Sequence, residues 1–134
     1  MVSLSARTVE WLVYTCLLGL IPVVARLLVW GIASKGVEPL AVSDLVAFGL
    51  VLHSANIQQV GRLGDTDKRW SAVHFGISII FIVIYALLMF TTILPSANLN
   101  QASILNVSLF LCIVSFILSF VVYMRMQAED RGSV

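Results

Sequence analysis

Two charged residues, Arg26 and Asp44, lie inside neighbouring stretches of this 134-residue sequence that are otherwise apolar. A charge in hydrocarbon is costly, so an intramembrane arginine and carboxylate at similar depth are expected to pair. At about 1.5 Å per helical residue, Arg26 lies roughly 10 Å and Asp44 roughly 6 Å from the outer end of its helix, so the two depths are compatible. The pair would form an outer gate or a fixed contact. Alternatively, Arg26 extends to the lipid headgroups while Asp44 caps its helix with Ser43.

The second apolar stretch carries polar residues on more than one face of the predicted helix. At about 100° per residue, Ser43, Ser54 and Gln58 share one side of a helix. His53 and Asn56 project from another side. We therefore expect this helix to be the most enclosed one, in the middle of a bundle or along the axis of an oligomer. Its polar side chains would either hydrogen-bond to other helices or line a pore.

Two histidines raise the question of a cofactor. His74, in the third stretch, falls at a depth similar to that of Asn56, and a hydrogen bond between the two is expected. His53 and His74 are common haem ligands by type, but their depths differ by about one helical turn, whereas axial ligands should be level. Cys16 and Cys112 also lie at different depths. We therefore expect no cofactor and no metal site.

The fourth stretch carries small side chains at spacings of four, three and four residues: Ser108, Cys112, Ser115 and Ser119. These spacings place the four on one stripe of a helix, which lets another helix approach closely. The stripe predicts a helix-packing or oligomer interface. No nucleophile with a base in reach, metal cluster or phosphate-binding loop is recognisable, so the sequence predicts a non-enzymatic protein.

Composition indicates the elements that position these residues. Hydrophobic residues make up 60% of the sequence and charged residues only 11%, against roughly a quarter charged in soluble domains. Four runs reach the length of about 20 apolar residues needed to cross hydrocarbon as a helix. We predict an all-α integral membrane protein with one four-helix domain over 1–134 and spans at about 11–33, 40–61, 70–94 and 102–125. The second span is the most polar, and its alternative is a re-entrant hairpin or a helix that leaves the lipid before Gln58.

The distribution of basic residues predicts orientation, since short loops rich in Lys and Arg stay in the cytoplasm. Arg7, Arg125 and a central cluster lie on one side, and the opposite connections carry only Lys35. Both termini are therefore expected in the cytoplasm, in a bacterial inner membrane. The central loop offers a docking surface for a soluble cytoplasmic partner through Arg62, Asp65, Asp67, Lys68 and Arg69. A net charge of +1 is not that of a nucleic-acid-binding protein.

Size and four spans are similar to those of the small multidrug transporters, which work around a carboxylate in their first helix. Here the only acidic residue of that helix is Glu10, at its edge. The transport activity is therefore not expected. The layout is also comparable to that of phage holins and of small membrane subunits of bacterial antiphage systems such as Kiwa.

Two functions fit these features. The first is a non-enzymatic membrane subunit or sensor that assembles into a homo-oligomer in the lipid bilayer and acts through a cytoplasmic partner, with a bacterial stress or antiphage defence system as one setting. The second is an oligomeric pore or ion conduit lined by the second helix. Both require self-association, because four helices are too few to enclose a hydrated path easily.

Overall fold

The computed structural model of the protein describes residues 11–33, 35–63, 67–94 and 99–132, although not every side chain near the edges of these ranges. The described chain is all-helical apart from its connections, as predicted. Its elements are η1 (Leu12–Leu17), α2 (Leu18–Ile32), α3 (Val42–Leu63), α4 (Lys68–Ile93) and α5 (Gln101–Gly132). Each predicted span coincides with a helical stretch, η1 and α2 forming the first, but α5 continues seven residues beyond the predicted end at 125.

Three helical stretches among the described residues are long and apolar enough to cross a membrane: Val13–Ile32, Lys68–Ile93 and Gln101–Ala128. They support a membrane location by length and composition. The helix α3 is not among them, because its polar residues interrupt the apolar run. A span formed by α3, and thus the four-span topology, stays a prediction.

Local sequence explains where the helices begin. The Asp67 side chain accepts a hydrogen bond from the backbone N–H of Trp70, at 3.2 Å, and so caps α4. The Asn100 side chain does the same for Ser103 at the start of α5, at 3.1 Å. Between α2 and α3 the chain reverses through Gly36, whose φ of +88° lies in the left-handed region that glycine adopts without strain.

The first membrane helix changes type along its length. Its beginning, η1, is a π-helix, and the α-helical part begins at Leu18, four residues before Pro22. Proline has no N–H to donate to the carbonyl of Leu18 and its ring crowds that carbonyl. The switch from π-helix to α-helix at Leu18, about one turn before Pro22, is therefore where the helix is expected to adjust to the missing hydrogen bond and the crowded carbonyl.

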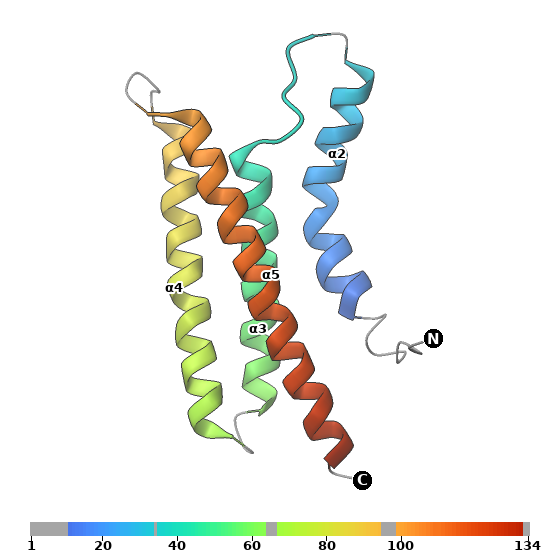
Figure 1. Ribbon diagram of the computed structural model, residues 1–134, viewed down its shortest axis with the longest axis vertical. Helices are drawn as coiled ribbons and strands as arrows, with labels where there is room; N and C mark the ends of the chain where they lie inside the picture. Colours follow the sequence, from blue (N-terminus) through green and yellow to red (C-terminus); the bar gives the residue numbers. More distant parts are fainter. Residues whose placement is uncertain (1–10, 34, 64–66, 95–98, 133–134) are drawn as a thin grey trace.

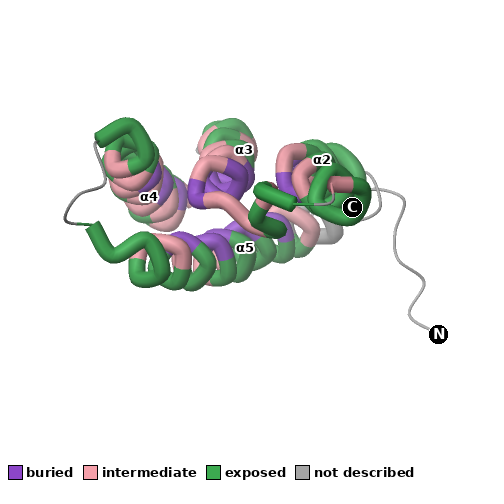
Figure 2. The backbone as a smooth tube through the Cα atoms, turned by 90° about the horizontal axis from the view of Figure 1, so that it is seen from above, coloured by how far each residue is buried: buried purple, intermediate pink, exposed green. Residues whose placement is uncertain are grey.

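The helices form a layer of three with a fourth laid across it. Consecutive helices run in opposite directions, so that α3 and α5 run the same way (Figure 1). Seen from above, α4, α3 and α2 lie side by side, and α5 crosses one face of the layer (Figure 2). We call the end where α3 finishes and α4 begins the Trp70 end, and the opposite end the Gln101 end. The position of α3 is the central one.

The main core is centred on α3, which has more buried side chains than any other helix. Val46, Phe48 and Leu52 of α3 cluster with Tyr85 of α4 and Cys112 of α5. The segment predicted as the second span is thus the most enclosed helix, as expected, and it lies in the middle of the bundle. The outward faces of α2, α4 and α5 expose many large apolar side chains, as a lipid-facing surface would.

A second, smaller cluster holds the start of the first helix to the end of α5. The ring of Trp11 stacks on that of Tyr123 with centroids 4.8 Å apart, and Cys16 completes the cluster. Among the described elements α2 packs along α3 and has no contact with α4 or α5, so this aromatic contact is what joins the first helix to α5 at the Trp70 end.

Candidate functional site

Arg26 of α2 and Asp44 of α3, the charges predicted to pair, meet between these two helices. Arg26 donates from Nε to Oδ2 of Asp44, which lies in the first turn of α3. The carboxylate is the better buried partner, with 12% of its side chain exposed against 32% for Arg26. Asp44 also lies where the positive end of the helix dipole favours an anion. The ion pair therefore forms within one chain and links the edge helix α2 to the central helix near the Gln101 end.

A close helix contact accompanies this ion pair. The ring of Phe48 on α3 packs against Gly19 of α2, and a Cβ atom at Gly19 would lie 2.8 Å from a ring carbon. Glycine therefore lets α2 approach α3 at a place where any side chain would collide. The charge pair and this contact together set the distance between the two helices.

A second polar cluster lies inside the bundle, where α3, α4 and α5 meet. Nε2 of His53 lies 2.9 Å from Oγ of Ser115, and the Tyr85 hydroxyl lies 2.8 Å from the same oxygen. All three residues have no exposed surface. Each residue comes from a different helix, so a single serine hydroxyl joins the three.

Two further contacts complete this polar cluster. The Cys112 thiol donates to the carbonyl oxygen of Leu45 at 3.1 Å and accepts from the Tyr85 hydroxyl at 3.8 Å. The His53 ring stacks on Phe81 of α4, with centroids 4.6 Å apart. Every member of the cluster is thus held by at least one neighbour from another helix.

The predicted stripe of small residues on α5 faces the inside of the bundle, next to the polar cluster. Cys112 and Ser115 belong to the polar cluster, while the Ser108 hydroxyl donates to the carbonyl of Ile104 in its own helix, at 2.8 Å. Ser119 is also without exposed surface, as are Ser108 and Ser115. The stripe packs α5 within the chain, so a second copy cannot reach it while the bundle is intact.

Gly49 was not singled out by sequence reasoning. A Cβ atom built there would lie 2.1 Å from a ring carbon of Tyr85, so the tyrosine ring rests directly on the backbone of α3. The available signal was the glycine one turn before His53 together with Ser71, Ser78 and Tyr85 at seven-residue spacing on α4. Those three residues are the buried face of α4.

The serine–histidine contact has the residue types of a nucleophile and its base. Sequence reasoning found no such pair because the two residues are 62 positions apart. However, Ser115 has no exposed surface and its hydroxyl is shared between His53 and Tyr85. A substrate atom cannot approach the hydroxyl in this arrangement. Its chemistry here is that of a hydrogen-bonded link between helices.

Three other polar residues of α3 differ in exposure: Asn56 is buried, whereas Ser54 and Gln58 are exposed. Asn56 is 2% exposed and its amide oxygen has no hydrogen-bond partner among the described residues. The expected bond from His74 is therefore not made to that oxygen, and His74 instead lies against the Trp70 ring, at 4.0 Å between centroids. Ser54 and Gln58 are exposed, on the side of α3 that α5 does not cover.

The Trp70 end carries most of the predicted partner-docking residues. Asp67 accepts a hydrogen bond from Nη2 of Arg125 at 3.1 Å, and the Arg125 guanidinium lies 5.9 Å from the centre of the Trp70 ring. Asp67 thus joins the start of α4 to α5. Arg62, Lys68 and Arg69 are exposed there, whereas Asp65 lies outside the described residues.

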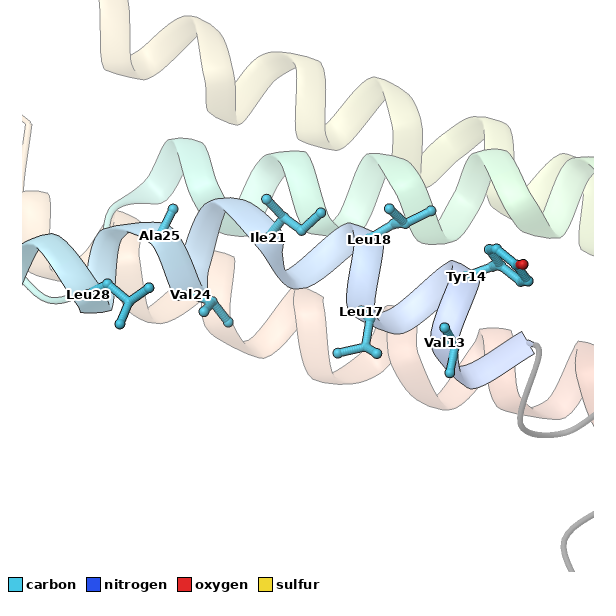
Figure 3. A pocket seen from close by; sticks show the side chains of 8 residues that line it. All are labelled: Val13, Tyr14, Leu17, Leu18, Ile21, Val24, Ala25 and Leu28. Atoms are coloured by element: carbon cyan, nitrogen blue, oxygen red, sulfur yellow. The ribbon is translucent and has the colours of Figure 1, made fainter.

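Two hollows lie away from the polar cluster. One of about 480 Å³ follows the outer surface of the first helix, and its eight lining side chains all come from that helix (Figure 3). Its lining is apolar apart from the Tyr14 hydroxyl, which fits contact with lipid chains. The other, about 770 Å³, lies at the Gln101 end and is lined partly by Glu38, Ser43 and Gln101. Neither hollow is lined by His53, Tyr85 or Ser115.

Metal ligands do not gather in the part of the chain that the structure describes, since no group of three or more His, Cys, Asp or Glu side chains could hold an ion there. Comparison of the chain with protein-family models, with curated proteins and with solved structures finds no match. The geometry of the polar residues is therefore the basis for inferring function.

Proposed function

We propose that this protein is a non-enzymatic subunit of a membrane complex that assembles with copies of itself and acts through a soluble partner at the Trp70 end. The observation that carries the proposal is the closure of the His53–Ser115–Tyr85 cluster. The side chains best suited to chemistry have no exposed surface and already bond to one another. An enzyme would need at least one of them open to a substrate.

The soluble partner is proposed from the charges at the Trp70 end. Arg62, Lys68 and Arg69 are exposed and close in sequence, while Asp67 is held by Arg125. The Asp67–Arg125 contact fixes the start of α4 against α5, so the basic side chains project from a defined surface. A partner with an acidic surface would complement them.

A second candidate function, an oligomeric conduit, is favoured by Ser54 and Gln58. Both side chains are exposed on a helix flanked by apolar helices. If several copies were arranged with this side inward, the two residues would face a central water column. His53 and Asn56 of the same helix are buried in the bundle, so at this depth a conduit would depend on Ser54 and Gln58.

The test combines reconstitution with partner capture. Purified protein in liposomes should pass no ions, whereas affinity capture of the tagged chain from native membranes should recover one soluble protein. A variant with Arg62→Ala, Lys68→Ala and Arg69→Ala should reach the membrane at the same level and lose that protein, because charge complementarity is removed. A matched control with Lys35→Ala, at the opposite end, should retain it.

Ion flux distinguishes the two candidate functions. A flux that changes in ion preference with Gln58→Ala or Ser54→Ala would reject the subunit proposal in favour of the conduit. A partner captured equally well by the triple variant would reject the basic surface as its docking site.

A further inference from the structure

We propose that the uncovered side of α3 is the contact face for a second copy of this chain, packed in parallel about a twofold axis so that Ser54 and Gln58 meet their own counterparts. This inference rests on the self-association in the proposed function and assigns it a face and a register. We call this side of α3 the open face, defined by Ala47, Ser54, Gln58 and Gly61.

Three sides of α3 are already occupied. Asp44 and Phe48 face α2, through the ion pair and the contact with Gly19. Gly49 and Val60 face α4, through the Tyr85 ring and a 2.8 Å hydrogen bond from the Ser71 hydroxyl to the Val60 carbonyl.

The third side faces α5 through Leu45, whose carbonyl accepts from Cys112. At about 100° per residue, Ala47, Ser54, Gln58 and Gly61 fall on the remaining side. The view from above shows α5 on one face of the three-helix layer, with the other face uncovered by any described helix (Figure 2).

The depth of the open face makes its polar groups informative. His53 stacks on Phe81, which lies at the middle of the apolar helix Lys68–Ile93. Ser54 follows His53 directly, so its hydroxyl lies near the middle of the bundle. Gln58 lies one turn closer to the Trp70 end. Lipid chains cannot hydrogen-bond, so a primary amide and a hydroxyl at these depths need polar neighbours.

A second copy satisfies these groups better than a different occupant. An amide has both donors and an acceptor, so two glutamines that face each other can exchange hydrogen bonds. A twofold axis along the membrane normal brings each residue opposite itself, provided that both copies insert with the same orientation. The excess of basic residues at the Trp70 end favours one orientation for every copy.

The shape of the open face permits this approach. Ala47 and Ser54 are short, and a Cβ atom at Gly61 would meet nothing within 4 Å. Small residues let two helix backbones come close, which strengthens dispersion contacts and hydrogen bonds between them. The comparable stripe on α5 cannot serve a second copy because it is buried against α3.

Single-cysteine cross-linking in native membranes tests the face. Ser54→Cys and Gln58→Cys should each give a disulfide-linked dimer on oxidation, because equivalent positions on a twofold axis come within disulfide reach. Ile80→Cys and Ile117→Cys are matched controls, exposed near mid-depth on the outward sides of α4 and α5, and should not cross-link. The unmodified chain, whose Cys16 and Cys112 are buried, should also stay single.

The outcomes separate this inference from the proposed function. Cross-linking at Ile80 or Ile117 but not at Ser54 and Gln58 would overturn the open face while leaving self-association in place. No cross-link at any position, with one copy per complex by single-molecule photobleaching, would overturn both. A cross-link from Ser54→Cys to a different protein would overturn the second-copy assignment.

A second measurement addresses the hydrogen bond itself. Gln58→Leu keeps the size and removes the amide, so dimerisation in lipid should weaken roughly tenfold, given the usual strength of interhelical hydrogen bonds. Ser54→Ala should weaken it much less, since a methyl group packs equally well. Unchanged or stronger dimerisation of Gln58→Leu would contradict amide pairing across the axis.

Discussion

The covered and uncovered sides of α3 differ in how their polar residues are used, although His53 and Ser54 are adjacent in sequence. His53 is fully buried, bonded to Ser115 and stacked on Phe81, whereas Ser54 is exposed. A rotation of about 100° between neighbouring residues is enough to separate them. The covered side is packed against neighbouring helices, and the open face remains available for an interaction.

This difference redirects the search for function. The cluster that most resembles a catalytic site is the one that holds α3, α4 and α5 together, because each of its hydrogen bonds crosses between helices. The chemically plainer Ser54 and Gln58 are exposed, so another molecule can reach them, as it can Arg62 at the end of the helix. In a helical membrane protein, accessibility therefore weighs more than residue type.

The largest effect is expected from a test of whether α3 crosses the membrane at all. Single cysteines at Lys35 and Lys68 flank α3, so a membrane-impermeant thiol reagent should label Lys35→Cys in intact cells and Lys68→Cys only after permeabilisation. In intact cells, Lys35→Cys should be labelled fully and Lys68→Cys not at all. Labelling of both from the same side would mean that the two ends of α3 lie on one side of the membrane. The two faces of α3 would then have to be compared for a helix that does not cross the bilayer.

Within the bundle, the covered side should be most sensitive at Gly49. Gly49→Ala places a Cβ atom 2.1 Å from the buried Tyr85 ring and should displace it from Ser115. We expect a loss of about 2 to 4 kcal/mol in the free energy of unfolding, from overpacking and a lost hydrogen bond.

Denaturant titration of the detergent-solubilised protein measures the loss at Gly49. Gly76→Ala is the matched control, since a Cβ atom at Gly76 meets nothing within 4 Å, and it should be neutral or slightly stabilising. Equal stabilities of the two variants would show that Tyr85 is free to move.

A smaller effect is expected where α2 joins α3. Arg26→Ala and Asp44→Asn should each reduce the free energy of unfolding by about 1 to 2 kcal/mol, between the values for exposed and buried ion pairs. The double variant should cost less than the sum, because each single change already removes the same contact. Additive losses in this cycle would indicate that the two charges act independently.

The smallest effects separate the serines of the two sides. Ser115→Ala removes the hydrogen bond to His53 and leaves the Tyr85 hydroxyl with only its longer contact to Cys112, so it should cost about 1 kcal/mol. Ser54→Ala on the open face and Ser108→Ala, whose hydroxyl bonds only within α5, should stay within about 0.5 kcal/mol. The free energy of unfolding is measured for the single chain in detergent. A loss of free energy for Ser54→Ala as large as that for Ser115→Ala would contradict the division of α3 into two sides.

Hydrophobic length and helical spacing predicted much of this arrangement. The Arg26 and Asp44 depths allowed the ion pair, and the polar faces of the second span predicted its central position. The Ser108–Ser119 stripe predicted close packing but not its partner, because spacing within one helix does not say which helix lies opposite. The Ser115–His53 contact was missed for the same reason, and the Tyr85 ring on Gly49 depends on the distance between two backbones.

The amino-acid sequence by itself determined which segments are helical and which stripe of each helix is polar or small, because both properties repeat along a single chain. The tertiary structure alone decided which stripes face each other. That choice depends on helix crossings between residues far apart in sequence, and it left Ser54 and Gln58 of α3 uncovered while burying His53 and Ser115.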